Sequence, residues 1–348
     1  MEKEGVLYTS LPNGRAICNL CYRRCNIPEN GIGFCGVREN IKGKIYSTIY
    51  GKIIALNIDP IEKKPLFHYK PGARMLSLGT VGCNFNCQYC QNWDISHTHE
   101  HLGSNITPEQ LVETALEHGA DGITYTYNEP TIFMEYAIDV AKLARKHKLF
   151  NTFVTNGYMT PEAAELASKY IDAMTVDFKG NASEAFARKY ISIVSESGIF
   201  DTLKVLKEKK VFIEITDLVV PKIGDSLEDA EKLVKWVYNN LGPETPIHFL
   251  RFHPDFKMTN IEETPIETLE AHYNLAKKLG MKYVYVGNAP GHEYENTYCP
   301  KCHALLIKRF IFDILEYNIT SDLRCPKCGE KINIAVKPNI SGVNGATG

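Results

Sequence analysis

Cysteine is the residue that most constrains how this chain folds. The 348 residues include eleven cysteines, and all of them fall into three tight groups. These groups are Cys18, Cys21, Cys25 and Cys35; Cys83, Cys87 and Cys90; and Cys299, Cys302, Cys325 and Cys328. The N-terminus lacks the basic and then apolar pattern of a secretory signal, so we expect a cytoplasmic protein. Because the cytosol keeps thiols reduced, the clusters indicate metal ligation rather than disulfides.

The composition is that of an ordinary globular protein, with 44% hydrophobic and 23% charged residues. Such a chain is long enough to bury a full core. No apolar stretch approaches the roughly 20 residues that cross a bilayer, so we expect no membrane association. The formal net charge of −2 gives no overall attraction to nucleic acid, and partners must be inferred from sites.

The middle of the chain alternates short β-branched or aromatic runs with amphipathic helical stretches, which is typical of βα units around a parallel sheet. We therefore predict an α/β fold, a partial or full (β/α) barrel. Three helices are predicted to start at Thr-Pro pairs, Thr107, Thr160 and Thr264, in which threonine caps the first turn. The predicted strands are Met75–Gly79, Gly122–Tyr127, Phe150–Thr155, Ala173–Phe178, Val211–Val219, Ile247–Phe252 and Lys282–Val286.

Two flanks interrupt this alternation and carry the other cysteines. We divide the chain into an N-terminal Cys-rich metal-binding segment (1–60), the barrel (61–295), a zinc ribbon (296–336) and a flexible tail (337–348). A strand-like run is also expected over Lys44–Leu56 within the first segment.

The central cysteines lie in a loop just after the first predicted barrel strand. Barrel enzymes keep their chemistry at the ends of such strands. Three thiolates hold three corners of a [4Fe–4S] cluster and leave one iron free for an exogenous ligand. A zinc knuckle completed by a distant residue and a set of packed thiols are the alternatives.

The spacing Cys83-x-x-x-Cys87-x-x-Cys90, with the aromatic Tyr89 before the last cysteine, resembles the signature of radical S-adenosylmethionine (SAM) enzymes. The resemblance implies a radical SAM barrel in which the three cysteines hold the catalytic cluster and the free iron chelates SAM. Electron transfer then cleaves SAM to a 5′-deoxyadenosyl radical that abstracts hydrogen from substrate. The protein positions and shields that radical.

The same resemblance implies SAM contacts at the ends of the following strands. Tyr127-Asn128-Glu129-Pro130 takes the place of the family's Gly-Gly-Glu motif but lacks both glycines. Thr155-Asn156-Gly157 and Asp177-Phe178-Lys179 follow the next two strands. The implied cofactor-binding residues are Tyr89, Asn128, Glu129, Thr155, Asn156, Asp177 and Lys179, beside the three cysteines. Tyr127, Asn128 and His253 are candidate substrate contacts.

Three further segments, residues 59–68, 90–96 and 284–288, resemble the radical SAM enzyme of the AmmeMemoRadiSam system. That family is related to the pyruvate formate-lyase activating enzymes. The resemblance implies Memo-type and AMME-type proteins as partners, and it does not name the substrate.

The flanking cysteines predict two more metal sites. Cys299-x-x-Cys302 and Cys325-x-x-Cys328 form paired knuckles typical of a closed, structural Cys₄ zinc ribbon. The N-terminal cysteines are separated by two, three and nine residues. Thiolates alone do not distinguish zinc from an iron–sulfur cluster, and we favour zinc slightly because no ferredoxin spacing is present.

We therefore predict a radical SAM oxidoreductase that takes electrons from a reduced ferredoxin or flavodoxin. One alternative is an activating enzyme that installs a glycyl radical on a protein partner. The appended modules are consistent with a macromolecular substrate, protein or RNA, and equally with structural staples for small domains that lack a core. A second alternative is a non-catalytic metal-binding scaffold, which predicts no SAM cleavage.

Overall fold

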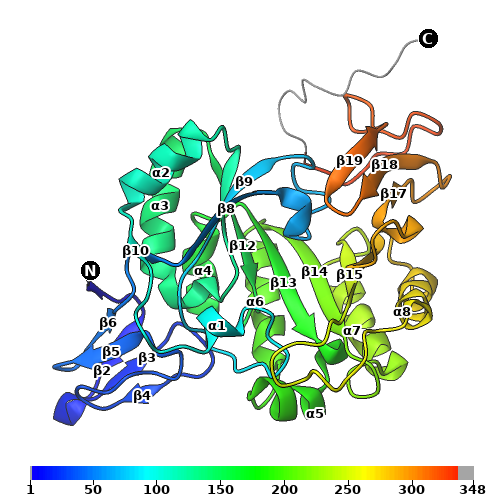
Figure 1. Ribbon diagram of the computed structural model, residues 1–348. Coiled ribbons are helices and arrows are strands. Elements are labelled where there is room, and N and C mark those ends of the chain that lie inside the picture. Colours follow the sequence, from blue (N-terminus) through cyan, green and yellow to red (C-terminus); the bar gives the residue numbers. More distant parts are fainter. Residues whose placement is uncertain (1, 336–348) are drawn as a thin grey trace.

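A single eight-stranded sheet forms the centre of the protein, as a computed structural model describing residues 2–335 shows (Figure 1). The strand order is β16-β15-β14-β13-β12-β11-β9-β8, and every neighbouring pair is parallel except β8 with β9. The strands are β8 (Ala55–Pro60), β9 (Arg74–Gly79), β11 (Gly122–Tyr125), β12 (Phe150–Thr155), β13 (Ala173–Lys179), β14 (Phe212–Val219), β15 (Ile247–Arg251) and β16 (Val284–Gly287).

The parallel strands agree with the predicted ones to within a few residues, because strands covered on both faces read as nearly continuous apolar runs. Residues 122–125 of β11, for example, are all buried. The edge strands β8 and β16 do not pair, so the sheet stays open. The full-barrel alternative is therefore wrong, and a partial barrel is what forms. β8, which lies in the predicted N-terminal segment, pairs antiparallel with β9.

Helices connect the parallel strands and lie along the outer face of the curved sheet (Figure 1). They are α2 (Pro108–Glu117), α3 (Met134–Lys146), α4 (Pro161–Ser168), α6 (Ser197–Glu208), α7 (Leu227–Asn240) and α8 (Ile266–Lys278), with short turns α1 (Trp93–Ser96) and α5 (Glu184–Phe186). Shorter 3-10 or π turns are η1 (Pro12–Gly14), η2 (Ile61–Lys63), η3 (Pro130–Phe133), η4 (Gly180–Ala182), η5 (Ala187–Ile191) and η6 (Glu293–Glu295). No helix within residues 2–335 has the length and apolarity that a membrane crossing requires.

Two of the three predicted threonine caps are confirmed. Thr107 forms a complete capping box with Gln110, and the Thr160 hydroxyl accepts from the Ala163 amide. The predicted cap at Thr264 is wrong. Its hydroxyl donates to the Val219 carbonyl instead, at 2.7 Å, and so ties the end of β14 to the start of the α8 segment.

Small sheets flank the central one. The N-terminal segment forms two three-stranded sheets, β1-β6-β5 and β2-β3-β4, and its β7 pairs with β10, which follows the cysteine loop. Their strands are β1 (Lys3–Glu4), β2 (Tyr8–Ser10), β3 (Ala16–Cys18), β4 (Asn26–Ile27), β5 (Arg38–Ile41), β6 (Lys44–Ser47), β7 (Lys52–Ile53) and β10 (Ser104–Asn105). A C-terminal antiparallel sheet contains β17 (Thr297–Tyr298), β18 (Leu305–Phe310) and β19 (Asp313–Tyr317). The predicted tail, 337–348, lies outside the described residues.

Candidate active site

The central cysteines lie in the loop that follows β9, at the carboxyl ends of the parallel strands. The loop is held by backbone hydrogen bonds from Asn86 to the Ile191 carbonyl and from Gln88 to the Tyr190 carbonyl, at 3.0 and 2.9 Å. Both acceptors belong to the η5 turn. The Phe85 amide donates to the Cys83 sulfur at 3.4 Å, a contact that stabilises a thiolate.

Burial dominates the electrostatics of these thiols. It raises the pKa of Cys87 to about 12 and the pKa of Cys83 and Cys90 above the usual range. Without a metal the three side chains are therefore neutral thiols at pH 7. Metal binding at this loop must displace their protons, which makes it dependent on pH.

Asn128 fixes the segment that leads into the cysteine loop. Its Nδ2 donates to Thr80 Oγ1 and to the Gly82 carbonyl, at 2.9 and 2.8 Å, while its Oδ1 accepts from the Thr80 amide. Gly82 itself has φ +85°, and a Cβ there would lie 2.4 Å from the Cys35 carbonyl. Only glycine fits this turn, because both the backbone conformation and the close approach exclude a side chain.

Glu129 joins the ends of β11 and β12 beneath the loop. Its buried carboxylate accepts from Thr155 Oγ1 at 2.7 Å, from the Asn156 amide at 2.8 Å, and from the amide and hydroxyl of Thr131. Burial raises the pKa of Glu129, although these four donors oppose the rise. Asn156 continues the chain of contacts, since its Nδ2 donates to Asn84 Oδ1 in the cysteine loop at 2.7 Å.

The structure thus brings Asn128, Glu129, Thr155 and Asn156 to the cysteine loop, and their role as SAM contacts stays a prediction. Their side chains, however, use their hydrogen bonds within the protein. These side chains hold the loop in place. A ligand at these strand ends would therefore contact the backbone.

Tyr89, Asp177 and Lys179 gather on the other side of the loop. Lys179 Nζ lies 3.3 Å from Asp177 Oδ2. Burial opposes the charge on Lys179, but Asp177 and the nearby Cys87 raise its pKa. The Tyr89 ring is buried between Phe186 and Phe252, with ring centroids 5.7 and 6.4 Å away, and its hydroxyl faces the Cys87 sulfur.

Two acidic residues missed by sequence reasoning lie beside this group. Glu196 and Asp217 are buried, and both carboxylate oxygens of Glu196 and Oδ2 of Asp217 lack a partner within the described chain. Burial raises the pKa of Asp217 to about 7, and burial and Asp217 together raise that of Glu196. For Asp217, the sequence signal was an acidic residue inside the apolar run of β14, because strands buried on both faces rarely carry an acid.

A cavity of about 330 Å³ opens beside the cysteine loop. Gln91, next to Cys90, forms one side, and the ends of β15 and β16 form another. Ile311 and Phe312, at the tip of the β18-β19 hairpin, close it from the C-terminal sheet. His253, a predicted substrate contact, lies on its rim with 61% of its side chain exposed. Tyr127, also a predicted substrate contact, does not line this cavity, and its hydroxyl donates to Asp59 at 2.7 Å.

Glu62 is the most unusual side chain of this cavity. It is fully buried, and its Oε1 accepts from the Gly72 amide at 3.0 Å, whereas its Oε2 has no partner in the described part of the chain. Burial raises the pKa of Glu62 to about 7, against the attraction of Arg309, whose Nε lies 3.9 Å away. The cavity therefore offers a buried acceptor to an incoming donor group.

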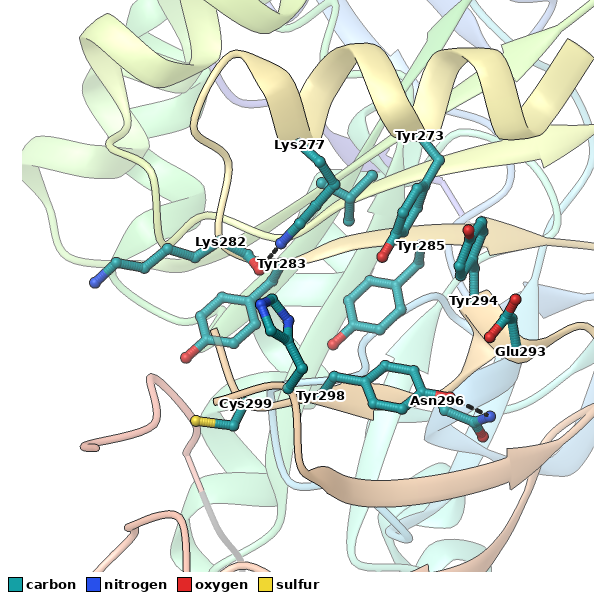
Figure 2. A pocket seen from close by; sticks show the side chains of 12 residues that line it. Tyr273, Lys277, Lys282, Tyr283, Tyr285, Glu293, Tyr294, Asn296, Tyr298 and Cys299 are labelled. Atoms are coloured by element: carbon teal, nitrogen blue, oxygen red, sulfur yellow. Dashed lines mark hydrogen bonds between the residues drawn. The ribbon is translucent and has the colours of Figure 1, made fainter. Parts of the chain in front are cut away.

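The C-terminal cysteines converge as the sequence predicts. Their four sulfurs lie within 4.8 Å of one another, and the Cys299–Cys328 and Cys302–Cys325 pairs are both 3.6 Å apart. Figure 2 shows the pocket between this group and the edge of the central sheet, lined by several tyrosines and reaching Cys299. Tyr273 and Tyr294 stack there with ring centroids 3.7 Å apart. None of the central cysteines lines this pocket.

The N-terminal cysteine group adjoins the cysteine loop, because Cys35 and Cys83 line the same cavity. Cys21 forms a β-bridge with Met159, which follows the third parallel strand of the central sheet.

Comparison with known proteins agrees with this arrangement. Residues 77–237, which contain the cysteine loop and the strands from β11 to β14, match the model of the radical SAM superfamily. This segment is a radical SAM domain, and the chain is homologous to the pyruvate formate-lyase activating enzymes.

Among its relatives, an uncharacterized protein of Methanocaldococcus jannaschii is 46% identical over 96% of this chain and 100% of that protein. The pyruvate formate-lyase-activating enzyme of Clostridium pasteurianum is 26% identical over 52% of this chain and 81% of that enzyme. Among solved structures, a radical SAM methyltransferase from Sphaerobacter thermophilus aligns with a TM-score of 0.48 and 12% identity over 63% of this chain and 68% of that one.

Proposed function

We propose that this protein uses a [4Fe–4S] cluster on Cys83, Cys87 and Cys90 to cleave SAM reductively. The cluster and SAM together supply a 5′-deoxyadenosyl radical, which abstracts a hydrogen atom from the substrate. The observation that carries the proposal is the loop of three partly buried cysteines at the carboxyl ends of the parallel strands, with unsatisfied polar groups beside it. An iron left without a fourth thiolate accepts an exogenous ligand.

The residues present fit both groups. Glu196 lies near Cys87 and beside Asp217, and both acids carry buried oxygens without partners among the described residues. Such atoms are expected where a polar ligand belongs. Asn128 and Glu129 hold the loop in one position by hydrogen bonds to buried backbone groups. Such preorganisation keeps the reacting atoms in place and water away from them.

The cavity next to Gln91 is the substrate site in this proposal. It lies beside the cysteine loop, and apolar side chains such as Phe67, Leu250 and Phe252 line much of it. At about 330 Å³ it accommodates a small molecule or one side chain of a larger substrate. The partnerless oxygen of Glu62 favours a substrate that presents a hydrogen-bond donor.

A second candidate function is activation of a glycyl-radical enzyme, which the homology to activating enzymes favours. In that case the cavity receives a loop of the partner protein. Reduced ferredoxin or flavodoxin is the proposed electron donor in both cases, and Memo-type or AMME-type proteins are proposed partners if the chain is the radical enzyme of the AmmeMemoRadiSam system.

We assign zinc to the C-terminal cysteines. Tetrahedral coordination with Zn–S bonds of about 2.3 Å places sulfurs roughly 3.8 Å apart. The two pairs at 3.6 Å are close to this value. Four thiolates leave no open position, so this zinc is structural and stabilises a small sheet that has little core of its own.

Anaerobic reconstitution tests the function. The protein is loaded with iron and sulfide, reduced with dithionite and given SAM, and 5′-deoxyadenosine is measured by chromatography. We expect the wild type to form it and Cys87→Ala to lose both the central cluster and the activity. Cys328→Ser is the matched control, because it removes a thiol far from the loop. Activity that survives in Cys87→Ala refutes the assignment, and a wild type that holds a complete central cluster yet leaves SAM intact favours the scaffold alternative.

A further inference from the structure

The N-terminal cysteines form a built thiolate site. Each of Cys18, Cys21 and Cys35 lies close enough to interact electrostatically with other members of the group, Cys25 included. The backbone amide two residues further on donates to the sulfur of each of these three, from Leu20, Arg23 and Val37 respectively. Amide donors aimed at sulfur stabilise negative charge on it, and this is the arrangement that metal-bound thiolates need.

The size of this site differs from that of the C-terminal one. Within residues 2–335, the Cys299 group is the one set of three or more His, Cys, Asp or Glu side chains whose ligand atoms all lie within 4.8 Å of one another. No three of the four N-terminal sulfurs therefore lie within 4.8 Å of one another. A single tetrahedral ion holds its sulfurs about 3.8 Å apart, whereas a cubane places each thiolate on a different iron and so holds them further apart.

The N-terminal site also adjoins the central cysteine loop. Cys35 and Cys83 line the same cavity of about 620 Å³. Arg23 donates to the Asn84 carbonyl of the loop at 2.5 Å. The Arg23 guanidinium lies close enough to interact electrostatically with thiols of both groups, Cys21 and Cys25 on one side and Cys83 on the other. One arginine side chain therefore spans the distance between the two sites.

We propose that Cys18, Cys21, Cys25 and Cys35 hold a second [4Fe–4S] cluster that passes electrons to the central one. This inference rests on the proposed function for the destination of the electrons. An external low-potential, one-electron carrier reduces the N-terminal cluster from the 2+ to the 1+ state. That electron then moves to the oxidised central cluster, which returns the N-terminal cluster to the 2+ state. Four thiolates close this second cluster, as expected for electron transfer rather than ligand binding.

The first test uses the full chain with Cys83→Ala, Cys87→Ala and Cys90→Ala combined, which removes the central cluster and leaves the N-terminal module intact. After anaerobic reconstitution we expect about four irons and four sulfides per chain. Reduction with dithionite is expected to give the electron paramagnetic resonance signal of a one-electron-reduced cluster. Adding Cys21→Ala and Cys25→Ala is expected to abolish both. A colourless triple variant that contains a second zinc in place of iron overturns the proposal.

The second test measures the coupling of the two clusters. In the fully reduced wild type, the N-terminal signal is expected to be broadened and to relax faster than in the triple variant, because a neighbouring unpaired spin acts on it. An N-terminal signal identical in the two proteins overturns the electron-transfer role. A wild type that fails to cleave SAM while the triple variant still binds iron refutes the proposed function alone, so the two failures are distinguishable.

Discussion

Glu62→Gln tests the electrostatics of the substrate cavity. Burial raises the pKa of Glu62 from 4.5 to about 7. Between these values the folded protein holds a proton that the unfolded chain releases, so the contribution of Glu62 to stability is fully present below about 4.5 and is lost as the pH rises toward 7. At 1.36 kcal/mol per pKa unit, the wild type loses about 2 kcal/mol between pH 5.5 and 8.5 through this group.

Glutamine removes this loss because its amide does not titrate. Its oxygen still accepts from the Gly72 amide, so the fold is preserved. Urea unfolding of both proteins, with the same metal content, is measured at pH 5.5 and 8.5. We expect the variant to gain about 2 kcal/mol relative to the wild type at the higher pH, or roughly 3 °C in Tm. The contributions of other titrating groups cancel when the pH-dependent change in unfolding free energy is compared between the two proteins. Equal pH dependence in the two proteins contradicts the reasoning.

Three further changes test other parts of the molecule. In the wild type the buried guanidinium of Arg38 lies 2.6 Å from the Glu135 carboxylate. Glu135→Gln leaves that guanidinium without its counter-charge, and urea unfolding should show a loss of about 3–5 kcal/mol in the free energy of unfolding. Gly82→Ala should lower iron binding strongly, whereas Gly119→Ala, also at positive φ but with open space around it, should leave the iron content unchanged. Cys328→Ser should remove about one zinc per chain by elemental analysis and lower the melting temperature without loss of iron.

Local sequence was enough to predict most of the central sheet. β12 has the predicted bounds, and β9 and β13 differ by one residue. Capping by Thr107 and Thr160 was also predictable, because a cap depends on side chains within one turn. Thr264 carries the same Thr-Pro signal, yet its hydroxyl bonds to β14, which is far away in sequence. A local pattern does not reveal such a competing partner.

The site divides in the same way. The spacing of Cys83, Cys87 and Cys90 was informative by itself, because metal ligands on one short loop are close together in any fold. The roles of Glu129 and Asn156 could not be predicted in this way, since each role is set by a partner on another strand end or in the cysteine loop. Glu196 and Asp217 were missed for the same reason: their burial and their lack of partners exist only after distant segments pack.

The sequence by itself therefore determined the chemistry of the ligands, the order of strands and helices, and the three cysteine groups. The tertiary structure decided that the sheet stays open and that the cavity lies between the cysteine loop and the C-terminal hairpin. It also decided that the N-terminal thiols lie beside the central ones. The physical reason is range. Periodicity, caps and ligand spacing act over a few residues, whereas burial, pKa and the distance between sites depend on contacts between residues far apart in the chain.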